Sequence, residues 1–512
     1  ENLDTLMGAI VKAKPAAAKG VAIAFDSRRM SPEFADTAAC VLAANGIKAY
    51  IFDSLRPTPE LSFALRTLGC TAGIVVTASH NPPEYNGYKV YWEDGAQITP
   101  PHDKGIMAEV KAITDFSTLK TMQEDNARVA NLFEIIGGAI DDAYIAELKK
   151  QVKNQDAIDE MQDQLTIVYT PLHGTGNIPA RRVMKEIGFT HVYVVPEQEL
   201  PNGDFPTVSY PNPEAKEAFE LGLKLAKEKD ADLVLATDPD ADRLGVYVKD
   251  TKSGEYIPLT GNMSGSLLCE YVLSQKQAAG KIPADGQVVK SIVSTNLIDA
   301  VAKAYGAELI EVLTGFKWIG KQILKNETTG HGTYLFGMEE SYGCLIGTYA
   351  RDKDAISATA ALCEAAAYYK QKGMTLWDAM IAMYEKYGYY KDAVKAIGLS
   401  GIEGLAKIQS IMETLRNNTP TEVGGYKVTS ARDYKLDTIK NMATGEVKPT
   451  GLPSSNVLYY DLEDGAWICV RPSGTEPKIK FYFGVKGTSL KDAEEKENAL
   501  GAAVMAMVDK MM

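Results

Sequence analysis

DLVLATDPDADR, residues 232–243, is an apolar run that ends in a loop of three aspartates and an arginine. The same order, a buried strand followed by a polar loop, appears in GIVVTASHNP (residues 73–82) and in TYLFGMEES (residues 333–341). Two further apolar runs precede each of these segments, with longer amphipathic stretches between them: 21–25 and 49–52, 165–169 and 191–195, 288–293 and 307–312. Short apolar runs that alternate with helical stretches are typical of parallel α/β units. The sequence therefore predicts three similar α/β domains with mixed, largely parallel sheets.

The last part of the chain has a different pattern. Residues 457–462, 466–470 and 478–485 alternate like antiparallel strands, and a helical stretch begins near Leu490. This pattern predicts a smaller C-terminal α+β domain. A polar, acidic stretch at residues 151–164 shows no core pattern, and the character of the sequence changes again at residues 386–392. We expect four domains, with these bounds: 1–160, 161–263, 264–388 and 389–512.

The composition and charge of the chain argue against some classes of function. The chain has 512 residues and a formal charge of −13. This charge argues against sequence-independent binding of nucleic acid, which needs a basic surface. The six cysteines are scattered singly, which predicts buried free thiols in a reducing compartment. No run of about 18 apolar residues and no signal-peptide pattern is present in the sequence. We therefore expect a cytoplasmic protein with no membrane or nucleic-acid partner.

Ser79 is the first candidate for chemistry. It directly follows the buried strand at residues 73–76, where a hydroxyl can face a cleft, as a nucleophile must. The alternative is that Ser79 and Asn81 only cap the following turn.

The aspartate loop is the candidate metal site. Asp238, Asp240 and Asp242 lie two residues apart, so alternate side chains can bring three hard oxygen ligands to one cation, for which Mg²⁺ is the natural choice. Arg243 would relieve repulsion among the carboxylates and would also suit an anionic phosphate. The alternative is a solvated acidic turn.

A phosphate cradle is predicted by the composition of RPSGTEPKIK, residues 471–480. It combines one glycine, two hydroxyls and three cations within ten residues. It lacks the order of a nucleotide-binding P-loop, which no other segment supplies either, so nucleotide hydrolysis is disfavoured. A plain hairpin turn remains the alternative.

Two further groups complete the candidates. Glu339, Glu340 and Ser341 offer acceptors that suit sugar hydroxyls. Lys353, between Asp352 and Asp354, could carry a proton or form an ordinary surface ion pair. The spacing alone favours the surface pair.

Taken in this order, the four loops resemble those of the α-D-phosphohexomutase superfamily, with the greatest likeness to bacterial enzymes of the phosphoglucomutase/phosphomannomutase type. NGYK at residues 86–89 adds to the resemblance, which covers nearly the whole chain. It implies four domains around a central cleft, three alike and one distinct. It also implies interconversion of glucose 1-phosphate and glucose 6-phosphate through a phosphoserine enzyme and a glucose 1,6-bisphosphate intermediate, with Mg²⁺ as cofactor.

The resemblance also implies roles for individual residues. Ser79 resembles the phosphoserine and, through its phosphate, a fourth metal ligand beside Asp238, Asp240 and Asp242. His80 resembles a residue that assists proton transfer, and Lys353 resembles the general base. The residues that resemble substrate binders are Arg243, which bridges the metal loop and the substrate, Glu339 and Ser341 for the sugar hydroxyls, Thr314, Gly315 and Lys317 in a second substrate loop, and Arg471, Ser473, Gly474, Thr475 and Lys480 for the non-reacting phosphate.

The sequence departs from the family at its start. The Gly-Thr-x-Gly-x-Arg-Gly loop that usually precedes the first strand has no match before Val21, and the chain begins at Glu1, so we expect a missing upstream segment. Arg28 could be one remaining substrate-binding cation near the phosphoserine, or a surface residue.

Other functions stay open at this stage. Phosphomannomutase or phosphopentomutase activity could be the main role, a phosphatase could use the same serine and metal, and an inactive sugar-phosphate-binding protein belongs to a different class. The sequence does not settle the oligomeric state.

Overall fold

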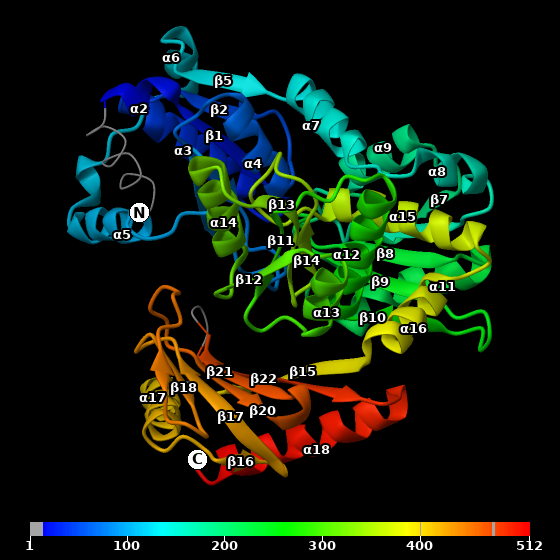
Figure 1. Cartoon of the computed structure of the whole chain (residues 1–512). Helices are drawn as coiled ribbons and strands as arrows, with labels where there is room; N and C mark the ends of the chain where they lie inside the picture. The colour runs from blue at the N-terminus through cyan, green and yellow to red at the C-terminus, as the bar shows by residue number, and fades with distance from the viewer. Residues whose placement is uncertain (1–13, 400, 474–476, 512) are drawn as a thin grey trace. The chain divides into compact units, whose positions relative to one another are not determined.

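The computed structural model describes residues 14–399, 401–473 and 477–511 (Figure 1). The chain divides into two compact units, and each is described by itself. The first comprises Glu1–Lys290, Tyr305–Ile310 and Gly315–Met380, and the second comprises Ser291–Ala304, Glu311–Thr314 and Ile381–Met512.

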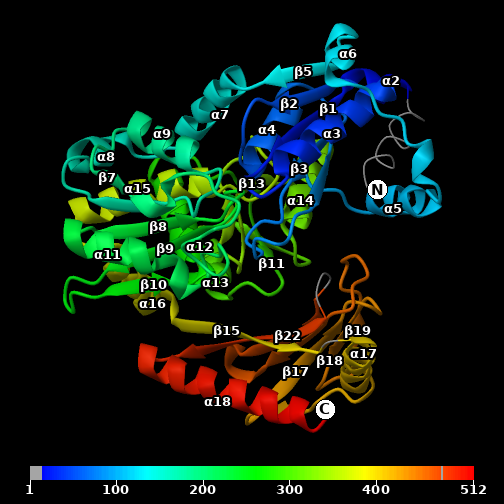
Figure 2. The ribbon, with the colours of Figure 1, turned by 180° about the vertical axis from the view of Figure 1, so that it is seen from behind.

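The first sheet has the strand order β4-β3-β1-β2-β5. β1, β2, β3 and β5 are parallel, and β4 pairs antiparallel with β3. The helices α3 and α4 lie against the central strands in both views (Figures 1 and 2). All residues of β1 and β3 are buried, as expected for strands covered on both faces. The bounds are β1 Val21–Phe25, β2 Ala49–Phe52, β3 Ala72–Val76, β4 Tyr88–Trp92, β5 Phe133–Ile136, α3 Ser31–Ala44 and α4 Thr58–Thr67.

The second and third sheets repeat this arrangement. Their orders are β10-β9-β8-β6-β7 and β12-β11-β13-β14. In each sheet the third strand of the predicted trio lies beside the first and is followed by an antiparallel neighbour, β9 or β14. Each polar loop therefore joins a parallel strand to an antiparallel one. The bounds are β6 Ile167–Thr170, β7 Val192–Val194, β8 Leu233–Thr237, β9 Leu244–Lys249, β10 Tyr256–Leu259, β11 Gly286–Ser291, β12 Glu308–Val312, β13 Thr333–Glu339 and β14 Gly343–Leu345.

The remaining helices of these three domains are α2 Lys14–Lys19, α5 His102–Ala112, α6 Glu124–Val129, α7 Gly138–Lys150, α8 Gln155–Met161, α9 Asn177–Ile187, α10 Pro196–Glu199, α11 Glu220–Lys229, α12 Gly261–Ala278, α13 Leu297–Ala304, α14 Phe316–Thr329, α15 Ala355–Gln371 and α16 Leu376–Tyr387. Among the described residues, no helix combines the length and apolar character needed to cross a membrane.

The C-terminal part contains an antiparallel sheet of order β15-β22-β21-β20-β17-β18-β19, with β16 paired to β17. Figures 1 and 2 show α18 lying along this sheet. Its core includes Ile468, Phe481, Phe483, Leu500 and Val504. The bounds are β15 Tyr389–Gly398, α17 Gly401–Asn417, β16 Glu422–Val423, β17 Tyr426–Asp433, β18 Thr438–Asn441, β19 Val447–Lys448, β20 Leu458–Leu462, β21 Trp467–Pro472, β22 Lys478–Gly487 and α18 Leu490–Asp509.

The predicted fold class is therefore confirmed as three α/β domains with mixed sheets and a distinct C-terminal domain. The expectation that residues 151–164 contain no core pattern is wrong. They include α8, whose first turn is capped by the Asn154 side chain and which buries Ala157 and Ile158. A helix of two turns buries too few residues to show a clear period in the sequence.

Candidate functional site

Ser79 lies in the loop after β3, within the first compact unit. Its Oγ donates a hydrogen bond to Asp238 Oδ2 over 2.8 Å and lies 3.2 Å from Nδ1 of His80. The hydroxyl therefore reaches the aspartate loop instead of capping its own turn. Its φ of +51° is in the left-handed region, which costs energy for a residue with a side chain. The backbone N–H of Ser79 donates to Thr77 Oγ1, and this bond helps hold the conformation.

Arg28 is hydrogen-bonded to the backbone of the serine loop. Its guanidinium donates to the backbone carbonyls of Ser79, Asn81, Pro82 and Tyr85. Its side chain has no exposed area, so the alternative of a surface residue is wrong. All four of these bonds go to the protein's own backbone, and this places Arg28 as a positioning residue for the loop.

The three aspartates form one buried cluster. Carboxylate oxygens of Asp238, Asp240 and Asp242 lie within 4.8 Å of one another, and at most 1% of each residue is exposed. The alternative of a solvated acidic turn is therefore wrong. Oδ1 of Asp240 and Oδ1 of Asp242 are buried, and no donor among the described residues bonds to either atom. Buried carboxylate oxygens without donors are costly, and Mg²⁺ prefers this kind of ligand, so these residues fit the metal.

Two lysines and an arginine surround this cluster. Lys89 Nζ lies 2.5 Å from Asp240 Oδ2 and 2.8 Å from Asp242 Oδ2, and Lys353 Nζ lies 3.1 Å from the same Asp242 oxygen. Arg243 Nη1 donates to Glu214 Oε1 over 2.9 Å. Burial raises the pKa of Asp238 well above its usual value, and the neighbouring carboxylates add to this effect.

Burial has the opposite effect on His80. It lowers the pKa of His80 to about 3, helped by the positive charge of Arg243. The imidazole next to Ser79 is therefore neutral near pH 7.

Lys353 is buried, so the surface ion pair favoured by its spacing is wrong. Burial alone would lower the pKa of Lys353, but the carboxylates of Asp242, Asp352 and Glu339 outweigh it and raise the pKa above its usual value. The ammonium form is thus the one favoured near pH 7. The stem of this side chain passes over Gly343, where a Cβ atom would come within 2.0 Å of Lys353 Cδ.

The predicted sugar-binding residues lie at the end of β13 and just after it. Glu339 is the last residue of the strand, and its buried Oε1 has no hydrogen-bond partner in the part of the chain that the structure describes. Burial raises the pKa of Glu339 to about 7. Ser341 Oγ lies 3.4 Å from Glu340 Oε1. An unpartnered carboxyl oxygen is available to a ligand hydroxyl.

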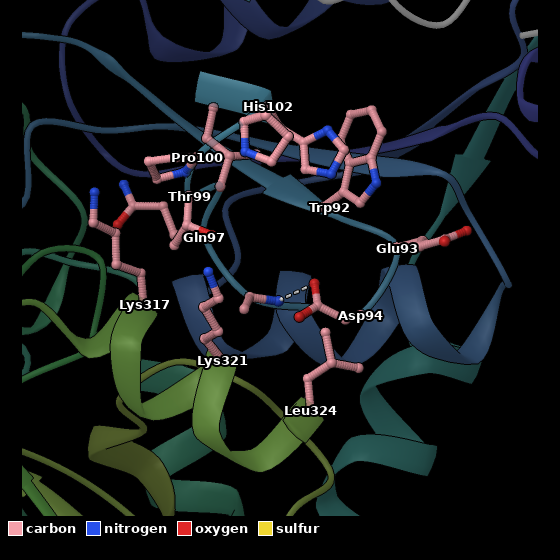
Figure 3. A pocket seen from close by; sticks show the side chains of 13 residues that line it. Trp92, Glu93, Asp94, Gln97, Thr99, Pro100, His102, Lys317, Lys321 and Leu324 are labelled. Carbon is pink, nitrogen blue, oxygen red and sulfur yellow. Dashed lines mark hydrogen bonds between the residues drawn. The ribbon is translucent and has the colours of Figure 1, made fainter. Parts of the chain in front are cut away.

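Lys317 extends from α14 into a cavity of about 440 Å³. Figure 3 shows Lys317 and Lys321 pointing from the helix towards Gln97 and Thr99. Trp92 and His102 stack on the opposite wall at 4.2 Å between ring centroids. Gly315, just before α14, has a φ of +112°, which favours glycine at this position.

The second compact unit holds the other predicted substrate binders. Thr314 Oγ1 is buried, and none of the residues at 14–399, 401–473 and 477–511 forms a hydrogen bond with it. Arg471 and Lys480 are directly paired across β21 and β22, and the backbone N–H of Ser473 donates to the carbonyl of Lys478 over 2.7 Å. Two cations at paired positions of neighbouring strands suit an anionic ligand such as a phosphate. Gly474 and Thr475 lie outside the described residues.

Two residues of the cluster escaped the sequence analysis. Thr58, at the start of α4, donates through its hydroxyl to Asp240 Oδ2 over 2.7 Å and through its backbone N–H to the Asp240 carbonyl over 2.9 Å. No local pattern marks Thr58. Lys89 belongs to the NGYK motif, and a lysine among the aromatic and apolar residues of the edge strand β4 is the signal that could have identified it.

Comparisons with known proteins give matches along most of the chain. Four family descriptions match in chain order. They are the α/β/α domains I, II and III of phosphoglucomutase/phosphomannomutase at residues 1–116, 142–254 and 260–387, and the C-terminal domain of the same proteins at residues 422–500.

Individual relatives match over most of their length. A phosphoglucomutase of Staphylococcus saprophyticus is 36% identical over 94% of this chain and 85% of its own. A probable phosphomannomutase of Haemophilus influenzae is 37% identical over 93% of this chain and 90% of its own. The solved structure of Paramecium parafusin, described as a phosphoglucomutase, has a TM-score of 0.71 at 19% identity and covers 99% of this chain and 91% of its own. With four domains matched in order and relatives above 30% identity over nearly its whole length, the chain belongs to the phosphoglucomutase/phosphomannomutase family.

Proposed function

We propose that this protein is a phosphoglucomutase that interconverts α-D-glucose 1-phosphate and glucose 6-phosphate. The observation that carries the proposal is the Ser79 hydroxyl, 2.8 Å from Asp238 in a buried cluster of three carboxylates. A phosphoserine at this position would share its charge with a cation held by Asp238, Asp240 and Asp242. Glucose 1,6-bisphosphate is the intermediate that the two transfers require.

Mg²⁺ held by the aspartates would neutralise the charge that develops on the transferring phosphoryl group. The chain's own residues do the rest. Glu339 and Ser341 accept hydrogen bonds from sugar hydroxyls and orient the ring. Lys317 and Arg243 balance the charge of a bound phosphate, and Arg471, Ser473, Gly474, Thr475 and Lys480 bind the phosphate that does not react.

In the return transfer, a phosphoryl group moves from the bisphosphate to Ser79. Ser79 Oγ attacks a phosphorus of the bisphosphate, a new bond forms between Oγ and phosphorus, and the bond from phosphorus to the sugar oxygen breaks. The neutral imidazole of His80, 3.2 Å from Oγ, accepts the serine proton, and the ammonium of Lys353 donates a proton to the departing sugar oxygen. The outward transfer runs through the same steps in reverse, so that Lys353 then acts as the base.

Intact mass and isomerisation assays test this function together. The purified chain should carry the mass of one phosphoryl group, which Ser79→Ala removes, and the variant should lose at least about a hundredfold in kcat, or ~2.7 kcal/mol of barrier. Ser253→Ala, an exposed serine in a turn, is the matched control and should keep both. Retained turnover in Ser79→Ala would show that the phosphoserine assignment is wrong.

Product analysis separates the remaining activities. Glucose 1-phosphate should isomerise without release of inorganic phosphate, whereas a phosphatase would release it. Mannose 1-phosphate should react more slowly than glucose 1-phosphate. Galactose 1-phosphate inverts carbon four, which leaves one buried acceptor unpaired and should lower kcat/KM roughly ten- to a hundredfold.

The proposal includes four domains, at about 1–160, 161–263, 264–388 and 389–512. The end of α16 at Tyr387 and the start of β15 at Tyr389 support the last boundary. A cytoplasmic location is supported by the six free cysteines.

A further inference from the structure

A second cavity, of about 300 Å³, is lined by residues of α4, α7 and α9. These three helices are labelled in Figure 1. Its wall is largely apolar and includes Leu55, Tyr144, Ile178 and Leu200. We call it the Glu60 pocket, after the carboxyl group that lines it. A volume of this size is at the lower end of known small-molecule sites, which are usually apolar with a few polar groups placed to fix orientation.

Two buried polar atoms in this pocket have no partner. Glu60 is 1% exposed and Thr175 is 2% exposed, yet neither Glu60 Oε1 nor Thr175 Oγ1 has a hydrogen-bond partner among the described residues. A buried polar atom without a partner costs roughly as much as a lost hydrogen bond, and it therefore points to a ligand or an ordered water. Two such atoms in one cavity wall are the feature that distinguishes this pocket.

The charges at the pocket are already paired. Arg56 donates to both carboxylate oxygens of Asp141, over 2.8 and 2.9 Å. Arg182 donates to Asp142 and to Glu186. Burial raises the pKa of Glu60 well above its usual value, and its hydrogen bond to Asp141 adds to this effect. Because the charged groups of the wall already have partners and Glu60 Oε1 is an unpartnered acceptor, the pocket favours an uncharged ligand that carries a hydrogen-bond donor.

The pocket is also connected to the metal loop. The backbone N–H of Thr175 donates to the Pro239 carbonyl over 2.8 Å. Gly174 packs so closely on Pro239 that a Cβ atom would lie 2.4 Å from the Pro239 Cα atom. On the other side, Thr58 and Glu60 share the first turn of α4, and Thr58 holds Asp240 by two hydrogen bonds.

We infer that the Glu60 pocket is a regulatory site for a small uncharged molecule with an apolar body and an N–H or O–H donor. The donor bonds to Glu60 Oε1, and Thr175 Oγ1 bonds to a second polar atom. An occupant contacts the two elements that hold the metal loop, namely the start of α4 and the 174–176 turn. Its binding is therefore coupled to binding of Mg²⁺, and the coupling is reciprocal.

Ligand-observed NMR on the full, Mg²⁺-loaded chain tests the site without reference to activity. Benzamide, a flat ring with an uncharged N–H donor, should bind with a Kd of roughly a millimolar, as expected for a molecule of its size. Benzoate has the same shape but a negative charge and no donor, so it should bind at least about tenfold more weakly. Equal binding of the two probes, or no binding of benzamide at roughly ten millimolar, would overturn the site.

Variants locate the binding. Ile178 lines the pocket but is 73% exposed, so Ile178→Trp should fill the entrance, leave the fold intact and abolish benzamide binding. Ile135→Trp, an exposed isoleucine of β5 outside the pocket, is the matched control. Glu60→Gln keeps an uncharged acceptor and should keep binding, whereas Glu60→Met should lose it. Binding that is unchanged in Ile178→Trp would place benzamide elsewhere and refute the assignment.

A separate measurement tests the coupling between benzamide binding and Mg²⁺ binding. The benzamide Kd should be about threefold lower with saturating Mg²⁺ than in excess chelator, because both ligands order the same two elements. A benzamide Kd that does not respond to Mg²⁺ would refute the regulatory role even if the pocket binds the probe. None of these measurements depends on which sugar phosphate the enzyme uses.

Discussion

Thr58 Oγ1 donates to Asp240 Oδ2 over 2.7 Å across 182 residues of sequence. This bond ties the start of α4 to the metal loop and orients one of the three carboxylates. A hydrogen bond to a charged group contributes about 1.5–3 kcal/mol. Orientation of a metal ligand by a neighbouring donor is a common way to set metal affinity.

Thr58→Val should weaken Mg²⁺ binding about tenfold, because the isosteric side chain keeps its shape but loses the donor. Isothermal titration calorimetry on the chelator-treated chain measures the change. Thr67→Val, near the end of the same helix, removes only a bond to the Phe63 carbonyl and should leave Mg²⁺ affinity as it is. An unchanged affinity in Thr58→Val would mean that Asp240 is oriented by other contacts.

The pH dependence of kcat/KM should report Glu339. Burial raises the pKa of its carboxyl to about 7. Below that pH the carboxyl group is protonated and accepts fewer hydrogen bonds from sugar hydroxyls. Above that pH both oxygens of the carboxylate can accept them. We expect kcat/KM to fall with decreasing pH below 7, by about tenfold per unit in the limit of one proton.

Glu339→Gln should have a lower kcat/KM and should lack this acidic limb. Glu340→Gln, one residue further along the chain, should retain the limb and serves as the control. A limb that persists unchanged in Glu339→Gln would assign it to a different group.

Arg28→Met should destabilise the serine loop strongly. It leaves the carbonyls bonded to Arg28 without their donor and the buried carboxylate of Asp26 without its partner, 3.3 Å away. Breaking a buried pair of this kind costs about 3–5 kcal/mol. Urea denaturation followed by tryptophan fluorescence would show the loss in the first unfolding transition, and intact mass would show less phosphorylated Ser79.

Arg29→Met is the control for this change, because Arg29 pairs with Asp204 at the surface. Arg28→Lys should fall between the two, since an ammonium cannot reach all four carbonyls in the planar geometry of a guanidinium. Full stability of Arg28→Met would contradict the positioning role.

Glu60→Gln should stabilise the protein at alkaline pH. Burial raises the folded-state pKa of Glu60 well above the usual 4.5, so the unfolded chain releases the proton at lower pH than the folded chain. Wild-type stability from this group is therefore lost as pH rises above about 4.5 towards the folded-state pKa. The amide variant has no proton to lose. Thermal melts from pH 5 to pH 9 should show the two proteins diverging as pH rises, and parallel curves would contradict a protonated Glu60.

Sequence patterns were sufficient to predict the three repeated sheets because their central strands are buried on both faces. β1 and β2 begin and end at the predicted residues, since continuous apolar runs bounded by turns leave little choice of register. The antiparallel strands β4, β9 and β14 were not predicted. β4 mixes buried and half-buried residues, and β14 is only three residues long, so neither has a distinct period.

The sequence did not predict that Arg28 and Lys353 are buried. Arg28 and Lys353 look like surface residues because their neighbours along the chain are polar. Each is buried by contacts from segments more than 50 residues away, which no local pattern reports. The sequence nonetheless singled out Ser79 and the three aspartates, which the structure brings together, because loops of unusual composition end equivalent strands.

The aspartate loop contacts residues that lie far from it in the sequence, and these are made at different times during synthesis on the ribosome. Asp238, Asp240 and Asp242 enter the second domain as mutually repelling charges, and their partners Thr58 and Lys89 have already been made, whereas Lys353 emerges more than a hundred residues later. The second domain therefore gains its full complement of counter-charges only when the third is nearly complete. We expect the nascent chain to pass through a loosely held aspartate loop, and docking of the segment around Lys353 to act as the step that locks it.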